Sequence, residues 1–290
     1  MEVIEREHFD EKEFREKFLN RKVVVYRGGI KSWPAIKNWN PDYFSKMCPD
    51  ISIATKRFES DGVKIENSTM AHYVESMKSF KKSQDEGSTE IGPYCHDIPI
   101  FLQAEHLRKD VGQFPINVIP KWYRKNWWQY VQFFMSSAGS VTPLHFDTLL
   151  TNNIFFQIQG RKCFTVMDFS DSKYCSRKSW RWYDIDPESP DLMKHPDYSK
   201  ATPKQVEINS GDLFYMPSGT LHHVRSLDDC ISFNIDFHNI HSLTRAFTAI
   251  PKGMPSINVY YNMICFLGVV LGVPAKKLFS RYKPYLNYVS

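Results

Sequence analysis

Two histidines and one aspartate are the residues of this chain best suited to chemistry. His145 and Asp147 stand two positions apart in the run His145-Phe146-Asp147, and His222 follows further along the chain. Two imidazoles and one carboxylate on one face of a metal leave three coordination positions open, which is typical of non-haem Fe(II) enzymes that activate O2. The chain is therefore predicted to be an oxygenase with His145, Asp147 and His222 as iron ligands and catalytic residues.

The first pair is expected to lie in a strand. Alternate residues of a strand point to the same side, so His145 and Asp147 can reach one metal together. The pattern His-x-Asp alone is weakly specific in a chain with ten histidines. Its plainer interpretation is a hydrogen-bonded pair on the rim of a barrel.

The third ligand is expected to return beside this pair by a hairpin. The turn Pro217-Ser218-Gly219 follows a predicted strand, and His222 opens the next one. His222 rather than His223 is expected to face inward, because His223 shares its side of the strand with Arg225 and arginine favours solvent.

Four other histidines are left out of the predicted site. His223 is expected to be an outer group beside it. His238 and His241 are expected to cap a helix or to lie on the surface. His96 stands in the run Cys95-His96-Asp97, which has no partner motif elsewhere in the chain.

Short apolar runs separated by glycine, proline and asparagine fill the chain from residue 131 onward. Strands this short and dense predict an antiparallel sandwich or barrel. The polar stretch 76–92 is expected to be a surface loop or a solvated helix, and the insertion 169–205 a substrate lid. The predicted strands are 22–27, 132–135, 153–158, 162–167, 206–209, 212–216, 222–227 and 231–237, and the predicted helices are 9–19, 39–47, 242–250 and 257–273.

The composition is that of a globular protein and singles out no partner. Hydrophobic residues make up 42% of the 290 residues, and a net charge of +5 is too mild to indicate nucleic-acid binding. Six cysteines without a Cys-x-x-Cys pair indicate reduced thiols. Because the amino terminus also shows no export signal, a cytoplasmic location is expected.

An uncharged stretch at 253–275 could form a membrane anchor, but its prolines and asparagines favour a helix packed on the protein. Gly268 and Gly272 have the spacing that lets two helices approach closely. This spacing predicts a homodimer through the carboxy-terminal helices.

The order of these motifs resembles that of the JmjC hydroxylases of the cupin superfamily, which use Fe(II) and 2-oxoglutarate. The asparaginyl hydroxylase that inhibits hypoxia-inducible factor and tRNA wybutosine hydroxylase belong to this group. The resemblance rests on the segments 21–35, 139–147, 153–162 and 190–222. It implies a mainly β fold, a double-stranded β-helix (jelly roll), flanked by helices. One domain would span 1–290, with a helix and strand layer at 1–130, the β-helix core at 131–240 and helices at 241–290.

The resemblance also implies which residues hold the cosubstrate. Lys162 matches the lysine that binds the distal carboxylate of 2-oxoglutarate, Thr142 matches a hydroxyl donor to it, and Asn153 and Asn234 match polar residues of the pocket. A lysine in an apolar strand is costly to bury without an anion, which favours this role for Lys162; a strand-edge lysine that reaches water is the alternative. Phe101 stands where the asparaginyl hydroxylase has a tyrosine, so this hydroxyl is expected to be missing.

The reaction implied is hydroxylation of an aliphatic C–H with release of succinate and CO2. The substrate stays open between a protein side chain, a tRNA base and a small metabolite, and the cations and aromatic rings at 177–182 could bind it. A metal-binding module without turnover, an enzyme that needs no 2-oxoglutarate, and a JmjC demethylase are the alternatives. The complete triad together with Lys162 favours the hydroxylase.

Overall fold

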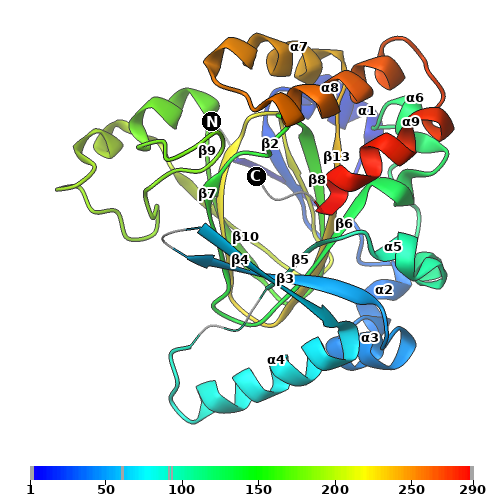
Figure 1. Cartoon of the computed structure of the whole chain (residues 1–290), viewed down its shortest axis with the longest axis vertical. Coiled ribbons are helices and arrows are strands. Elements are labelled where there is room, and N and C mark those ends of the chain that lie inside the picture. The colour runs from blue at the N-terminus through cyan, green and yellow to red at the C-terminus, as the bar shows by residue number, and fades with distance from the viewer. Residues whose placement is uncertain (1–2, 60–61, 91, 93, 288–290) are drawn as a thin grey trace.

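Two facing β-sheets form the centre of the molecule (Figure 1). The computed structural model describes residues 3–59, 62–90, 92 and 94–287. The larger sheet has the strand order β1-β2-β11-β8-β13-β6-β5-β3-β4, and the smaller has the order β10-β9-β12-β7. The strands are β1 Val3–Arg6, β2 Val23–Tyr26, β3 Ser52–Glu59, β4 Gly62–Thr69, β5 Tyr94–Ile98, β6 Val131–Ser136, β7 Val141–His145, β8 Asn152–Gln159, β9 Lys162–Met167, β10 Lys204–Ile208, β11 Leu213–Met216, β12 Leu221–Ser226 and β13 Cys230–Phe237.

Alternating side chains of the central strands fill two separate cores. Phe155 of β8 packs with Phe164 and Phe214 between the two sheets. Its neighbours Ile154 and Phe156 belong to the larger core on the other side of the sheet. Burying one such side chain contributes about 1.5–3 kcal/mol, and the period of two lets one strand serve both cores.

Helices cover the ends and the outer face of the larger sheet. Figure 1 shows α4 along one end and α7, α8 and α9 along the other. The start of α7 is fixed by a capping box, in which the Asn239 side chain accepts from the Ser242 amide and the Ser242 hydroxyl accepts from the Asn239 amide. The helices are α1 Glu11–Glu13, α2 Pro34–Asn38, α3 Pro41–Met47, α4 Met70–Asp85, α5 Ile100–Gln103, α6 Lys121–Arg124, α7 Ile240–Thr248, α8 Ser256–Val269 and α9 Ala275–Tyr282.

The predicted fold class is confirmed, because the strands between 131 and 240 form the two walls of a jelly roll. The layer before residue 131 contains more strand than predicted, since β3, β4 and β5 extend the larger sheet. Residues 76–85 form the end of α4, so this part of the polar stretch is a solvated helix.

Gly268, the first glycine of the predicted pair, packs within the chain. Gly268 of α8 lies against the indole of Trp122, where a Cβ would come within 2.2 Å of ring atoms, and Gly272 lies beyond the helix end with φ +70. The close approach of helices from two subunits is therefore not needed to explain Gly268. No helix of the described residues has both the length and the apolar character needed to span a membrane.

Candidate active site

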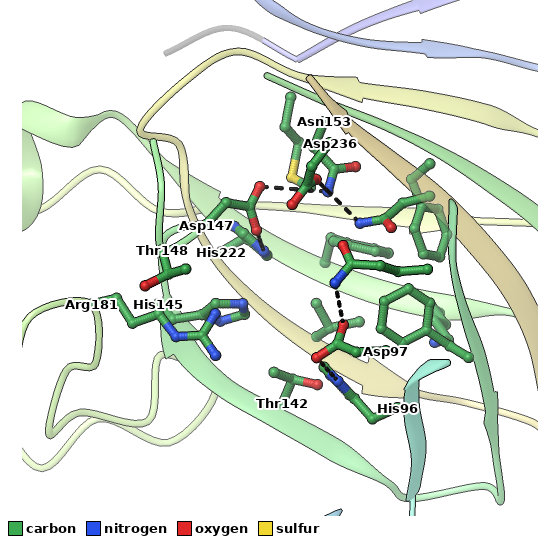
Figure 2. A pocket seen from close by; sticks show the side chains of 18 of the residues that line it. His96, Asp97, Thr142, His145, Asp147, Thr148, Asn153, Arg181, His222 and Asp236 are labelled. Carbon is green, nitrogen blue, oxygen red and sulfur yellow. Dashed lines mark hydrogen bonds and ion pairs between the residues drawn. The ribbon is translucent and has the colours of Figure 1, made fainter. Parts of the chain in front are cut away.

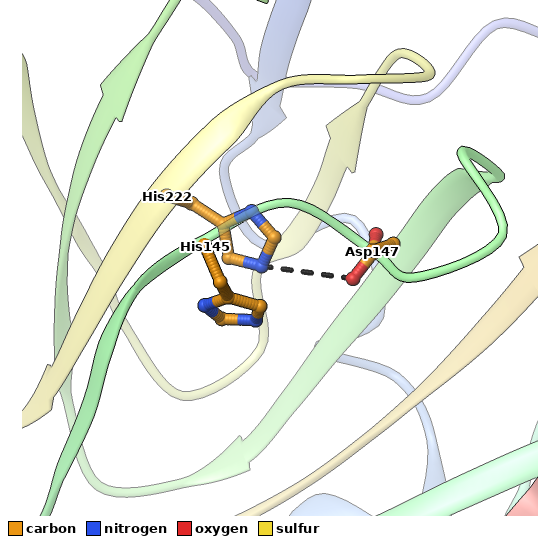
Figure 3. Close-up of side chains that lie close together, drawn as sticks. All are labelled: His145, Asp147 and His222. Atoms are coloured by element: carbon orange, nitrogen blue, oxygen red, sulfur yellow. Dashed lines mark ion pairs between the residues drawn. The ribbon is translucent and has the colours of Figure 1, made fainter. Parts of the chain in front are cut away.

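The three predicted iron ligands lie together between β7 and β12 (Figure 3). His145 ends β7 and is paired in register with His222 of β12. Nε2 of His222 lies 3.7 Å from Oδ1 of Asp147, and the two imidazole centroids are 4.1 Å apart. One potential ligand atom from each residue lies within 4.8 Å of the others. This set offers two nitrogens and one carboxylate oxygen to a single cation.

The expectation that Asp147 lies within the strand is wrong. β7 ends at His145, and Asp147 follows in the turn that leads to β8. The carboxylate reaches the histidines because the chain bends there, and not because alternate strand residues share a face. Asn153 of β8 holds it, since Nδ2 of Asn153 donates to Oδ2 of Asp147 over 3.4 Å.

Both histidines are oriented for metal binding by backbone carbonyls. Nδ1 of His145 donates to the Pro143 carbonyl over 2.7 Å, and Nδ1 of His222 donates to the Thr220 carbonyl over 3.1 Å. Each Nε2 is thereby left as the acceptor that a metal requires. Burial lowers the pKa of His145 well below its usual value, which favours the neutral ligand form.

Lys162 is buried in the same pocket, to whose lining Thr142 and Asp236 also belong (Figure 2). Its side chain is on β9 and only 1% exposed, and Nζ donates to the hydroxyl of Tyr94 over 2.6 Å. Among the described residues, Nζ has no ion pair with a carboxylate, and its other close neighbours are the rings of Tyr94, Phe134 and Phe155. Burial lowers the pKa of Lys162 to about 8. A buried ammonium without an anion is costly, so the pocket fits the carboxylate of a ligand.

The other three predicted pocket residues also line this cavity. Thr142 is buried on β7. Nδ2 of Asn153 donates to Oδ1 of Asp236 over 2.8 Å, and Nδ2 of Asn234 approaches the same oxygen at 3.4 Å. The side-chain oxygens of both asparagines have no hydrogen-bond partner among the described residues. Asn153 also donates to Asp147 and so orients this candidate ligand, a contact that the sequence did not predict.

The predicted loss of a tyrosine hydroxyl is wrong. Phe101 lies in the outer core, packed against Trp127 and Phe233, and is not among the residues that line the pocket. Tyr94 of β5 supplies a hydroxyl next to Lys162 instead. The only signal in the sequence was that Tyr94 begins a short segment, 94–98, which was not recognised as a strand.

A buried ion pair was also missed on the opposite wall of the pocket. Nζ of Lys56 lies 2.6 Å from Oδ2 of Asp97, which also lies 2.8 Å from Nδ1 of His96. His96 and Asp97 both line the pocket, and β5 bulges between Cys95 and Ile98. The bulge turns the His96-Asp97 pair inward, although this pair has no recognisable motif of its own.

The insertion 169–205 reaches the metal cluster, as expected of a segment over the active site. Trp182 forms an isolated bridge with His145, and their rings lie 4.9 Å apart. Arg181 lines the pocket, its buried Nε has no hydrogen-bond partner among the described residues, and Figure 2 shows it beside His145. Trp180 instead anchors the insertion, because its indole donates to the Thr148 carbonyl over 2.8 Å.

The family described as "Cupin-like domain" matches residues 10–242 of this chain. The match covers most of the sequence, and the chain therefore belongs to this family.

Individual relatives are more distant. The human "Bifunctional peptidase and (3S)-lysyl hydroxylase JMJD7" is 23% identical, over 74% of this chain and 76% of its own. The chicken (Gallus gallus) "tRNA wybutosine-synthesizing protein 5" is 24% identical, over 76% and 73%. "Lysine-specific demethylase 8" of Xenopus tropicalis is 24% identical over 77% of this chain, but only 49% of that protein is covered. The comparisons confirm the expected class, an enzyme of the JmjC and cupin-like oxygenases.

Proposed function

We propose that this protein is an Fe(II)- and 2-oxoglutarate-dependent hydroxylase that inserts one oxygen atom into an aliphatic C–H bond. The observation that carries the proposal is the shared pocket. It combines a cluster of two histidines and one carboxylate with the buried ammonium of Lys162. A cupin that only binds metal has no need of a buried cation in the same pocket as the metal cluster.

The donor set fits the cofactors that the family implies. His145, Asp147 and His222 would hold Fe(II), which would supply O2 activation coupled to the conversion of 2-oxoglutarate to succinate and CO2. Lys162 and Tyr94 would bind the distal carboxylate of 2-oxoglutarate at the far end of the pocket.

The remaining pocket residues fix orientation and exclude water. Thr142 offers a hydroxyl to the same carboxylate, and Asn153 keeps Asp147 turned toward the histidines. Trp182 covers one face of His145, which limits access of water to that ligand. The protein contributes to catalysis by holding the ligands and the cosubstrate in a fixed orientation.

The substrate is proposed to present a hydrogen-bond acceptor to Arg181. This cation faces the pocket, and no carboxylate lies within salt-bridge distance of it among the described residues. A protein side chain, a nucleoside or a small molecule can each carry such an acceptor. The names of the relatives, which include a lysyl hydroxylase and a tRNA-modifying protein, span two of these classes. We also propose a cytoplasmic location, which the six unpaired thiols support.

The test is succinate formation. The protein is loaded with Fe(II) and 2-oxoglutarate without oxygen, and succinate is measured after O2 is admitted. We expect His145→Ala to abolish succinate formation and Lys162→Ala to raise the 2-oxoglutarate concentration required. His241→Ala, which changes an exposed histidine outside the pocket, serves as the control. An unchanged succinate yield in His145→Ala would remove the proposal.

A further inference from the structure

A second group of metal-type ligands lies on the outer side of β12. Its members are Asp186 and Glu188 of the insertion and His223 of the strand, and one potential ligand atom of each lies within 4.8 Å of the others. The iron-site residues meet the same spacing. Because neighbouring strand residues point to opposite sides, His222 faces the pocket while His223 faces this second cluster.

The imidazole of His223 is buried without a hydrogen bond. The residue is 3% exposed, and its Nδ1 has no hydrogen-bond partner among the described residues. Its Nε2 faces Oδ1 of Asp186 at 3.9 Å, which is too long for a hydrogen bond. The unpaired Nδ1 costs about 1–3 kcal/mol, while Nε2 is the ring nitrogen that faces the Asp186 carboxylate and is available to a cation.

Glu188 also keeps one carboxylate oxygen available. Nε of Arg225 lies 2.6 Å from Oε2, whereas the buried Oε1 has no hydrogen-bond partner among the described residues. Burial and the charge of Glu188 raise the pKa of the nearby Cys163 thiol, which offers only a weak S–H donor. Arg225 therefore pairs with Oε2 of Glu188, and Oε1 is available to a second cation.

We propose that Asp186, Glu188 and His223 bind a divalent transition-metal cation of the zinc type. An imidazole with two carboxylates suits such a cation better than Mg²⁺ or Ca²⁺, which take oxygen ligands. Ligand atoms around tetrahedral Zn²⁺ lie about 3.3 Å apart. The Asp186 side chain is 57% exposed, and its Oδ1, which accepts from the Glu188 amide over 2.9 Å, keeps a second lone pair for the cation.

The cation would fasten the insertion to the barrel. Asp186 and Glu188 follow closely on Arg181, which lines the pocket, and on Trp182, whose ring lies 4.9 Å from that of His145. A metal bound to residues 186, 188 and 223 joins this segment to β12, directly behind the iron ligand His222. Its role is thus to position the insertion over the active site.

The site can be measured apart from the iron centre. In a chain with His145→Ala and Asp147→Ala, a Co²⁺ titration followed by absorbance and calorimetry is expected to show one remaining equivalent. Adding His223→Asn or Glu188→Gln is expected to weaken this binding by more than about tenfold. Arg225→Gln is expected to strengthen it, because a competing positive charge is removed. A purely structural role for Arg225 predicts no such gain.

The matched control is His195→Asn, which changes a buried histidine of the insertion whose Nδ1 is already bonded to the Ser176 hydroxyl at 2.8 Å. It should leave Co²⁺ binding unchanged. If His223→Asn does not fold, Asp186→Asn changes an exposed side chain and gives the same test. The proposal is overturned if the doubly substituted chain binds no Co²⁺, or if Asp186→Asn and Glu188→Gln bind it as tightly as the control does.

Discussion

The proposed pairing of Lys162 with 2-oxoglutarate predicts that cosubstrate binding depends on pH. Burial lowers the pKa of this lysine to about 8, so the free protein loses the ammonium as the pH rises through that value. The cosubstrate pairs with the charged form. We therefore expect its dissociation constant to be constant below about pH 7 and to rise by up to about tenfold per pH unit above 8.

Anaerobic calorimetry with 2-oxoglutarate across this pH range measures the effect. Lys162→Arg keeps its charge at all these pH values, so any binding that it retains should lose the decline above pH 8. A dissociation constant that stays flat to pH 9.5 in the unsubstituted protein contradicts the assignment of Lys162.

Tyr94, and not Phe101, is expected to support the cosubstrate site. Tyr94→Phe removes the hydroxyl that accepts from Lys162 and should weaken 2-oxoglutarate binding by about tenfold to 150-fold, because one hydrogen bond to a charged group contributes about 1.5–3 kcal/mol. Phe101→Tyr buries a hydroxyl in the outer core and should lower the free energy of unfolding by about 1–3 kcal/mol without changing 2-oxoglutarate affinity. Binding and denaturant titrations of both variants separate the two positions.

The sequence predicted the pocket residues that belong to a motif. It did not predict the pocket residues that reach the site only through the pairing of distant strands. His145, Asp147, His222 and Lys162 carry spacing or burial signals of their own. Tyr94, like the His96-Asp97 pair, reaches the pocket because β5 pairs with β6 and bulges there. A pairing between distant strands leaves no local pattern to read.

At the scale of elements, short apolar runs predicted the buried strands and failed at the edge of the sheet. β8 and β13 are almost wholly buried, so their apolar runs stand out. β4 is an edge strand with mostly exposed residues, among them Lys64, Glu66 and Asn67. Polar residues keep an edge strand from pairing with other chains. Because of the same residues, a search for apolar runs does not find the strand.

Gly268 is expected to be required by the packing of α8 on α6. A Cβ there would come within 2.2 Å of the Trp122 indole, so Gly268→Ala should lower the free energy of unfolding by about 1–3 kcal/mol. Met193→Ala, at a side chain that is 95% exposed, should cost little. Combining Gly268→Ala with Trp122→Phe should recover part of the loss. Equal losses with and without Trp122→Phe would show that the indole is not the cause.

The molecule as a whole leaves an apolar stripe uncovered on and beyond α8. Ile257, Tyr260, Met263 and Leu271 are 36%, 46%, 44% and 61% exposed, and the first three recur every third residue along one side of the helix. Large exposed apolar side chains that gather on one face are typical of an interaction surface. We propose that a second copy of the chain covers them, which keeps the carboxy-terminal homodimer although the glycine pair no longer supports it.

A charge placed in this stripe should separate the subunits. Tyr260→Glu with Met263→Glu would bury two carboxylates in the dimer, which is costly without partners, so sedimentation equilibrium should show a monomer. Met193→Glu is the control, because this apolar side chain is 95% exposed in the insertion and far from α8 in sequence. Since neither change touches a pocket residue, 2-oxoglutarate binding by the monomer should match that of the parent protein. A parent protein that is already monomeric, or a dimer that survives both glutamates, would exclude this face as the interface.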